Sequence, residues 1–344
     1  MTNIYRVGIV GSGFGVRSHL PALTAHPRFE VVALASPNSA ARVAAERNIA
    51  QSFASAAQMI AGAKLDAIVV ASPPFTHRDD VLAALDGGLH VLCEKPFALN
   101  VAQAQEMVDA AKRAGTACGM SHEFRWIPER IALKQMIDNG HLAPLREIEI
   151  TQLAGWLRAD GTRKRGWWFD RARGGGIGGA LLSHLIDTAT WLAGRAPQRS
   201  NGFLRTANAR RTDPEGAFES TADDGAFAIV DYGDGLIARL ACDATCAVDQ
   251  FTLAIHAENR TAVASGASMH ELRLFAVGTE ETDELECKPS PYARFAAVDP
   301  HVPYLMELYD QWVAQIETGK SALPTFEDAL VTQRVLASIG YGAD

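Results

Sequence analysis

Short apolar runs recur through the first third of the chain, and this pattern constrains the fold more than any other feature. The runs cover residues 4–10, 30–36, 65–72, 89–94 and 116–120, and helical stretches such as residues 39–48 and 101–115 separate them. Strands this apolar are buried on both faces, which requires a parallel sheet with helices on each side. Residues 1–121 are therefore predicted to form a doubly wound α/β domain.

The pattern changes after residue 121. Residues 125–140 predict one helix, and residues 144–156 alternate in the way typical of a strand with one solvated face. Similar strand segments follow between residues 223 and 277, and two helical segments, 301–319 and 326–339, come last. We expect a second α/β domain over residues 122–344, built on a large open, mostly antiparallel sheet. Its last helix is a candidate to pack back on the first domain.

Composition narrows the class of protein. A chain of 344 residues with 48% hydrophobic content exceeds what one core usually reaches, so two domains are expected. The 32 basic and 40 acidic residues form no basic stripe, which disfavours nucleic acid as a partner. No signal-peptide pattern and no long apolar run is present, and the five cysteines are scattered, so we expect a cytoplasmic protein with reduced thiols and no membrane partner. No metal-ligand spacing and no nucleophile turn is found, so no metal is expected.

A glycine-rich turn follows the first apolar run. Gly11, Gly13 and Gly15 lie between this strand and a predicted helix, where a backbone free of side chains can approach a pyrophosphate. The third position of the strict fingerprint is Val16 instead of glycine, which leaves an ordinary tight turn as the alternative. We interpret the turn as a dinucleotide-binding site.

The end of the second predicted strand bears on which dinucleotide binds. An acidic residue about 20 residues beyond the glycine turn usually binds the ribose 2′-hydroxyl. This chain has Ser36 there, with Asn38 and Arg42 nearby, so no carboxylate repels a 2′-phosphate. The sequence favours NADP over NAD, although Arg42 could equally be a solvated helix residue.

Three stretches together carry a family resemblance: the glycine turn with "SHLPAL", the segments "ASPPFTH" and "HVLCEKPFALN", and "GGGIGGALLSHLID". In this order the chain resembles the Gfo/Idh/MocA family of NAD(P)-dependent oxidoreductases. The resemblance implies a nicotinamide between a Rossmann domain and an α/β domain whose open sheet is often used for oligomer contacts, so a homo-dimer or homo-tetramer is expected. Family members mostly oxidise or reduce a hydroxyl or carbonyl of sugars, polyols and related small molecules, but substrate identity is not inherited at this level.

The matched positions imply roles in the first domain. Lys95 follows the fifth apolar run, at the carboxyl edge of the sheet, where an ammonium can stabilise charge on a substrate oxygen. Glu94 is a candidate to orient it. The family also uses the "ASPPFTH" loop along the cofactor, although His77 could instead begin a helix. The cofactor-binding candidates are Gly11, Gly13, Phe14, Gly15, Ser36, Asn38, Arg42, Ser72, Pro73, His77, Glu94 and Lys95.

The resemblance also gives a role to a histidine in the second domain. A lone histidine in an apolar helix is more often structural, but the family pattern places a proton-transferring residue at His184. On a 3.6-residue repeat Ala180, His184 and Asp187 share one face. Family members often have an aspartate where this chain has Ala180, so the usual Lys, Asp and His set is incomplete. Asp187 is expected to support the helix and the cofactor cleft.

Substrate contacts are the least constrained prediction. The segment 155–176 is dense in tryptophan and arginine, which suits a sugar ring or an anion, or else a solvated loop or an oligomer contact. Candidate substrate residues are Trp168, Arg158, His122 and Arg125.

The leading hypothesis is an NAD(P)-dependent oxidoreductase that acts on a CH–OH or carbonyl group of a sugar, polyol or related cyclic compound. Lys95 and His184 are its catalytic residues. One alternative is a catalytically silent dinucleotide-binding sensor, which the alanine at position 180 keeps open. Another is cofactor-retaining epimerase or lyase chemistry.

Overall fold

The computed structural model describes residues 3–159, 163–278 and 282–342. By its contacts the chain forms two compact units. The first contains the chain up to Glu123 together with Ser290–Leu330, and the second contains Phe124–Pro289 and the chain from Val331 onward. The contact units differ from a division into residues 1–121 and 122–344 chiefly because Ser290–Leu330 belongs with the first unit. That domain division stays a prediction.

The first unit is built on a six-stranded parallel sheet, ordered β3-β2-β1-β4-β5-β6. This order reverses direction between β1 and β4, and a sheet of this kind binds ligands beyond the carboxyl ends of its strands near that point. The predicted doubly wound Rossmann fold is confirmed. The strands are β1 (Tyr5–Val10), β2 (Phe29–Ala35), β3 (Gln51–Phe53), β4 (Ala67–Val70), β5 (His90–Cys93) and β6 (Cys118–Met120).

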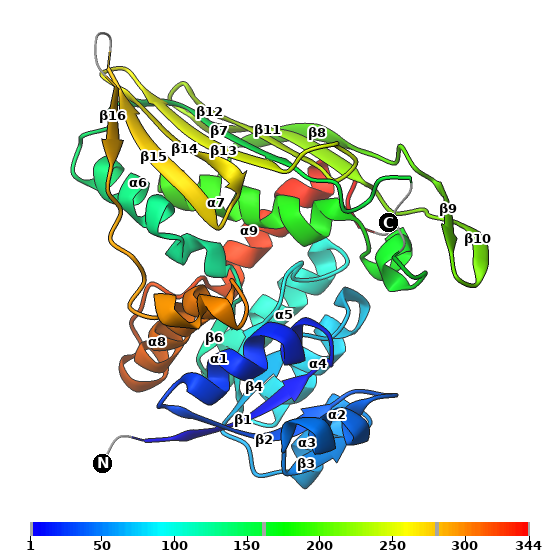
Figure 1. The fold of residues 1–344 in the computed structure, drawn as a ribbon. Helices are drawn as coiled ribbons and strands as arrows, with labels where there is room; N and C mark the ends of the chain where they lie inside the picture. Colours follow the sequence, from blue (N-terminus) through cyan, green and yellow to red (C-terminus); the bar gives the residue numbers. More distant parts are fainter. Residues whose placement is uncertain (1–2, 160–162, 279–281, 343–344) are drawn as a thin grey trace. The chain divides into compact units, whose positions relative to one another are not determined.

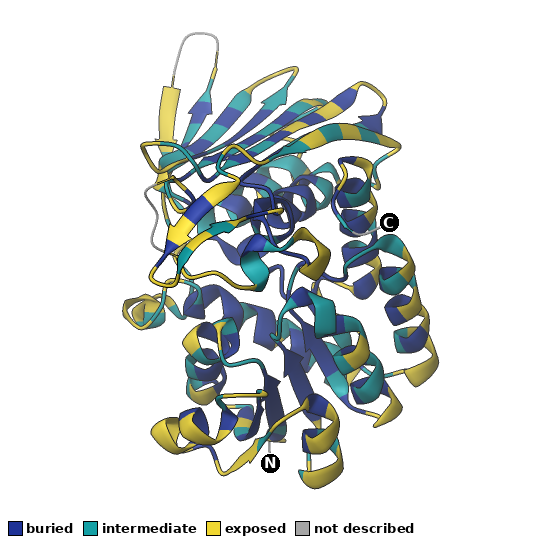
Figure 2. Cartoon of the chain, turned by 90° about the vertical axis from the view of Figure 1, so that its right-hand side faces the viewer, coloured by how far each residue is buried: buried dark blue, intermediate teal, exposed yellow. Residues whose placement is uncertain are grey.

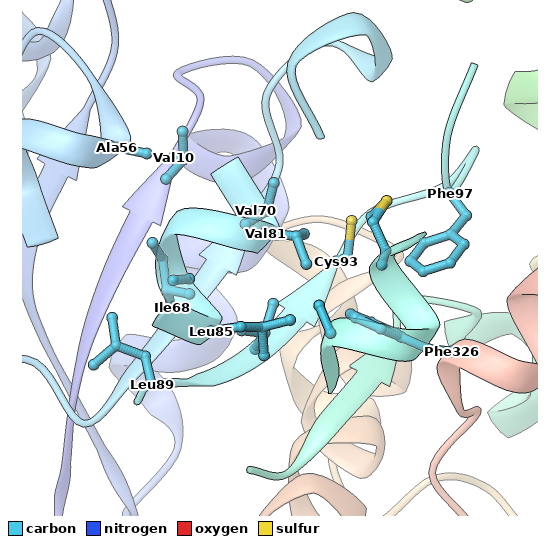
Figure 3. Close-up of a cluster of buried hydrophobic side chains, with 14 of the residues drawn as sticks. Val10, Ala56, Ile68, Val70, Val81, Leu85, Leu89, Cys93, Phe97 and Phe326 are labelled. Atoms are coloured by element: carbon cyan, nitrogen blue, oxygen red, sulfur yellow. The ribbon is translucent and has the colours of Figure 1, made fainter. Parts of the chain in front are cut away.

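Apolar strands and helices close the core of this unit. Every residue of β4 is fully buried, and Figure 2 shows the central strands of this sheet in the buried colour. Side chains from the strands meet those of α4 and α5, and Phe326 reaches the same cluster against Phe97, with ring centroids 4.6 Å apart (Figure 3). The helices are η1 (Gly15–His19), α1 (Leu20–Ala25), α2 (Ala40–Arg47), α3 (Ala56–Gly62), α4 (Pro74–Asp86), α5 (Val101–Ala114), η6 (Ala293–Ala297) and α8 (Val302–Thr318).

The second unit is built on an eight-stranded sheet, ordered β16-β15-β14-β13-β7-β12-β11-β8. Among the described strand pairs of this eight-stranded sheet only β7–β12 is parallel, which confirms the predicted mostly antiparallel sheet. The strands are β7 (Leu145–Leu153), β8 (Arg199–Arg205), β11 (Gly225–Gly233), β12 (Leu236–Asp243), β13 (Gln250–Ala257), β14 (Thr261–Ser268), β15 (Glu271–Val277) and β16 (Thr282–Leu285). A separate hairpin pairs β9 (Arg210–Asp213) with β10 (Gly216–Glu219).

The two faces of this sheet differ. Helices α6 (Pro128–Asp138) and α7 (Ser183–Ala193) lie on one face (Figure 1). On the opposite face Phe203, Ile229 and Ile237 remain 58%, 56% and 41% exposed. Along β12 buried and more exposed residues alternate, as a strand with one covered face requires.

Short helical turns connect the remaining segments. They are η2 (Glu123–Trp126), η3 (Trp167–Phe169), η4 (Arg171–Arg173) and the π-helical turn η5 (Gly178–Leu182). Helix α9 (Phe326–Ser338) begins in the first unit and ends in the second. In the part of the chain that the structure describes, no helix is both long and apolar enough to cross a bilayer.

Candidate functional site

The glycine turn joins β1 to the helix formed by η1 and α1. Gly11 has a φ of +105°, and a Cβ atom there would lie 2.2 Å from the Ala71 carbonyl oxygen, so only glycine fits. Gly15 packs tightly on β1, since its Cβ would lie 2.9 Å from the Ile9 side chain. Gly13 borders open space. The turn therefore leaves room for a phosphate beside a helix N-terminus, which fits a dinucleotide.

Three serine hydroxyls converge beside this turn. Ser12 lies in the turn, Ser36 at the end of β2 and Ser39 at the start of α2, and their oxygens are 2.8–3.2 Å apart. Asn38 is exposed. Arg42 is also exposed and pairs with Glu46 one helical turn later, at 2.7 Å. Hydroxyl groups thus occupy the position where a carboxylate usually binds ribose.

The loop after β4 is held by internal hydrogen bonds. The Ser72 hydroxyl donates to Asp80 at 2.7 Å, and Pro73 precedes the first residue of α4. His77 is fully buried within α4, with one ring nitrogen 2.8 Å from the Ser72 carbonyl oxygen and the other 3.0 Å from that of Pro96. Burial lowers the pKa of His77. This histidine ties the loop after β4 to the loop after β5.

Glu94 and Lys95 follow β5 at the carboxyl edge of the sheet. Glu94 is buried, and its carboxylate lies 2.9 Å from Nε2 of His19. Burial by itself raises the pKa of Glu94, but the hydrogen bond and charge of His19, with the charge of Lys95, outweigh it and lower that pKa to about 2. Lys95 is partly exposed, and its Nζ lies 5.8 Å from the ring centre of Phe14 in the glycine turn. Within the first unit the structure therefore brings the predicted lysine to the predicted phosphate turn.

In the second unit a carboxylate fixes the start of the helix that carries His184. Gly176 has a φ of +105°, and its Cβ would lie 2.2 Å from Asp223. The Gly178 amide donates to the same carboxylate at 2.6 Å. The glycine-rich segment therefore permits the close approach of Asp223. Burial of Asp223 raises its pKa to about 6.

His184 lies in the first turn of α7 and is 2% exposed. Its ring stacks on Phe124, with centroids 4.0 Å apart and planes 27° apart. The guanidinium of the buried Arg130 lies 5.3 Å from the centre of the same Phe124 ring. Ala180, on the preceding π-helical turn, is partly exposed within an otherwise buried segment. The sequence predicts a 3.6-residue repeat that places Ala180 on the same face as His184 and Asp187. Because Ala180 lies in the π-helical turn, this repeat holds only from Ser183 onward.

Asp187, further along α7, forms a buried ion pair with Arg125. Nε of Arg125 donates to one carboxylate oxygen at 2.8 Å, and Nη2 donates to the other at 2.6 Å. This two-point contact fixes both side chains. The support role expected for Asp187 agrees with this geometry, and a substrate contact by Arg125 stays a prediction.

The other substrate candidates lie in separate places. His122 is buried directly after β6 in the first unit. Trp168 is partly exposed in η3, and the guanidinium of Arg163 lies 4.1 Å from its ring centre. Arg158 is exposed, and residues 160–162 of the same segment lie outside the described residues. No substrate role is tested by this placement.

Four residues that surround Glu94 or His184 or hold their segments were not predicted: His19, Phe124, Asp223 and Tyr309. The Tyr309 hydroxyl lies 2.6 Å from Nδ1 of His19. The only local signal for His19 is its position in the helix after the glycine turn. The others come from apolar or loop segments that resemble ordinary core or turn sequence.

Comparison with known proteins identifies the family. Residues 5–122 match the model of the NAD-binding Rossmann fold of the oxidoreductase family, and residues 131–263 match the GFO/IDH/MocA C-terminal domain. The chain is 28% identical to an uncharacterized oxidoreductase of Synechocystis sp. PCC 6803, over 96% of this chain and 91% of that protein. It is 28% identical to 1,5-anhydro-D-fructose reductase of Ensifer adhaerens, over 68% of each chain. Levoglucosan dehydrogenase in complex with NADH and levoglucosan has the same fold, with a TM-score of 0.86, 21% identity and coverage of 98% of this chain and 96% of that one.

These matches and the Rossmann sheet with its glycine turn define an NAD-binding oxidoreductase fold. The chain belongs to the Gfo/Idh/MocA family of oxidoreductases, and its relatives include enzymes that act on sugars.

Proposed function

We propose that the protein is an NAD(P)-dependent dehydrogenase or reductase that acts on a CH–OH or carbonyl group of a sugar, polyol or related cyclic compound. The observation that carries the proposal is the position of Lys95. Its ammonium lies at the carboxyl edge of the parallel sheet, beside Phe14 of the phosphate turn. In folds of this type that edge is where the ligand binds.

Lys95 has the role of an electrostatic catalyst in this proposal. Its ammonium donates a hydrogen bond to the reacting oxygen and stabilises the negative charge that develops there. The nicotinamide, when bound, accepts or supplies the hydride. Groups that stabilise transition-state charge in this way contribute about 10²- to 10³-fold each.

His184 is proposed as the proton-exchanging residue. When a hydroxyl is oxidised, the imidazole takes the hydroxyl proton, and in the reverse direction it returns it to the oxygen. The stack on Phe124 holds the ring at the start of α7. General acid–base catalysis of this kind contributes about 10²- to 10⁴-fold.

NADP is the preferred cofactor in this proposal, with NAD as the other. Support comes from the hydroxyl cluster of Ser12, Ser36 and Ser39, which leaves the end of β2 without a carboxylate. The phosphates are assigned to the backbone around Gly11, Gly13 and Gly15. Phe14, Ser72 and Pro73 line the same edge.

A second copy of the chain is the proposed macromolecular partner, in a homo-dimer or homo-tetramer. The open face of the eight-stranded sheet supports this proposal, because Phe203, Ile229 and Ile237 expose apolar surface on it. Contiguous exposed apolar surface commonly marks an interaction site.

The test is a panel of sugars, polyols and their carbonyl forms, followed by nicotinamide absorbance at 340 nm. Turnover is expected in the wild type, with Lys95→Ala lowering kcat by about 10²- to 10³-fold while the cofactor Kd changes little. Lys320→Ala, an exposed lysine after α8, is the matched control. Unchanged turnover in Lys95→Ala would overturn the lysine assignment. Cofactor binding without turnover on any compound would favour a sensor, and product formed without net absorbance change would favour cofactor-retaining chemistry.

A further inference from the structure

A buried chain of hydrogen bonds runs behind Lys95 in the first unit. Nε2 of His19, on η1, lies 2.9 Å from the Glu94 carboxylate, and Nδ1 of the same ring lies 2.6 Å from the Tyr309 hydroxyl on α8. His19 and Tyr309 are 0% exposed, and Glu94 is 6% exposed. Three segments far apart in the sequence therefore meet in one buried polar chain that ends beside Lys95.

The order of donors in this chain follows from the charge on Glu94. A carboxylate can only accept hydrogen bonds, so Nε2 of His19 must carry a proton. In a neutral imidazole the other nitrogen, Nδ1, is then an acceptor and the Tyr309 hydroxyl donates to it, whereas in a charged imidazole both nitrogens donate and the Tyr309 oxygen accepts. Burial raises the pKa of Tyr309 well above its usual range, so its hydroxyl keeps that proton. In either state the contact with Tyr309 fixes the ring so that Nε2 of His19 donates to Glu94.

We propose that His19 and Tyr309 are positioning residues that keep Glu94 ionised and in place, so that its charge holds the Lys95 ammonium at the carboxyl edge of the sheet. The proposal rests on the proposed catalytic role of Lys95. It assigns no contact with substrate to His19 or Tyr309. Lys95 also has the Phe14 ring beside it, and that ring meets His19 edge-on with centroids 5.4 Å apart.

The electrostatics around Glu94 make this chain testable by pH. Burial opposes the charge on Glu94, and His19 is the largest influence that opposes burial. His19 and Lys95 are the titratable groups that lower the pKa of Glu94, and the Ser121 hydroxyl adds a hydrogen bond in the same direction. The charge of Glu94 in turn affects His77, Cys93 and Tyr309. Removing the His19 donor leaves burial opposed by Lys95 and Ser121 alone, so the pKa of Glu94 rises and the carboxyl takes up a proton more readily.

The decisive experiment compares pH profiles of kcat/KM. His19→Leu is expected to lower kcat about tenfold to a hundredfold at neutral pH, in line with the cost of misplacing a catalytic group. It should also add an acid limb to the wild-type profile, beyond any limb that His184 gives, because activity requires ionised Glu94. His19→Gln keeps an amide N–H toward Glu94 and should restore most of the activity without that limb. Tyr309→Phe should change the profile in the same direction as His19→Leu, but by less. His19→Leu combined with Glu94→Gln should lose the added acid limb and keep only the pH dependence that His184 gives.

A control removes another buried histidine of the same unit, one that pairs with an exposed carboxylate. His26 is 2% exposed and lies 3.2 Å from Asp310. Its ring meets that of Tyr309 edge-on with centroids 6.1 Å apart, so the variant disturbs the packing of Tyr309 but keeps the His19 donor to Glu94. His26→Leu should lower stability without creating an acid limb. An acid limb in His26→Leu that is absent from the wild type, or no added limb in His19→Leu, would overturn the positioning role.

A second readout does not depend on turnover. The gap in melting temperature between wild type and His19→Leu should widen as pH rises from about 4.5 to 8. In the variant Glu94 has a raised pKa in the folded state, so ionisation of Glu94 lowers the stability of the variant over this pH range. In the wild type the pKa of folded Glu94 is lowered, so its stabilising contribution is already complete above the pKa of the unfolded chain. Adding Glu94→Gln to both backgrounds should remove the widening. If no substrate turns over, the proposed function fails, but the difference in melting temperature still tests the hydrogen-bond chain. A difference that stays constant with pH overturns only the positioning role.

Discussion

His184 and Phe124 form a face-to-face ring pair, with centroids 4.0 Å apart and planes 27° apart. Phe124 precedes α6 and His184 opens α7, so the pair joins the starts of two helices that cover the same sheet face. An aromatic pair of this kind contributes about 0.5–1.5 kcal/mol beyond the area it buries. The orientation of the imidazole therefore depends on a residue that has no proton to exchange.

The first prediction concerns this stack. Phe124→Leu keeps apolar volume but removes the flat ring, so we expect kcat to fall about tenfold, in line with the free energy of such a pair. The KM for cofactor should stay constant. Steady-state kinetics on the substrate found by the panel checks this. Phe275→Leu on β15 is the control, and equal losses in the two variants would show that the effect is general destabilisation.

The second prediction concerns the buried pair of Arg125 and Asp187. Arg125→Ala leaves a buried carboxylate without its two-point partner, so we expect a loss of about 3–5 kcal/mol in the free energy of unfolding. The double variant Arg125→Met with Asp187→Leu removes both charges and should recover much of that loss. Urea unfolding of the wild type, Arg125→Ala and the double variant measures the free energy of unfolding of each. A change in substrate KM with unaltered stability in Arg125→Ala would instead favour a substrate contact.

Much of the first unit could be predicted because its strands are buried on both faces and glycine marks the turn after β1. Strand β3 escaped prediction, since its residues, Gln51–Phe53, form a short exposed edge without an apolar run. The lysine and glutamate of the "EKP" segment could be predicted from their place after a buried strand. The partners of Glu94 could not, because His19 and Tyr309 are distant in sequence and have no spacing pattern. Likewise, no sequence period signals the π-helical turn before His184.

The third prediction follows from the raised pKa of Asp223. The native state binds a proton on Asp223 more tightly than the unfolded chain, whose value is 3.8, so this group lowers stability progressively as pH rises toward about 6. The full difference corresponds to about 3 kcal/mol. Asp223→Asn should therefore gain stability relative to wild type between about pH 4 and 7, as measured by melting temperature at each pH.

Asp231 provides a control of opposite sign. A hydrogen bond from the Gly233 amide and another from Arg199 lower its pKa, so its contribution is present at neutral pH and is lost on acidification. Asp231→Asn should approach wild-type stability as pH falls. Parallel profiles for Asp223→Asn and wild type would contradict the assignment.

The fourth prediction concerns the open sheet face. Ile229→Lys places a charge in the centre of the apolar residues that this face exposes, and we expect the oligomer to dissociate. Light scattering after size-exclusion chromatography gives the mass of each variant. Val298→Lys adds the same charge at a residue of the first unit that is 63% exposed, and its mass should equal that of wild type. A wild type that is monomeric at all concentrations would contradict the proposed assembly.

The fifth prediction tests cofactor preference at Ser36. Its hydroxyl lies 2.9 Å from that of Ser39 and 3.2 Å from that of Ser12, so a carboxylate introduced here would face any 2′-phosphate at short range. Two like charges about 4 Å apart near a protein surface repel by up to about 4 kcal/mol. We therefore expect Ser36→Asp to raise the Kd for NADPH at least about tenfold and to leave the Kd for NADH unchanged or lower, because a carboxylate can accept from a ribose 2′-hydroxyl. Fluorescence titration of both cofactors measures this, with Ser321→Asp as the control, and a wild type that binds NADH more tightly than NADPH would reverse the preference.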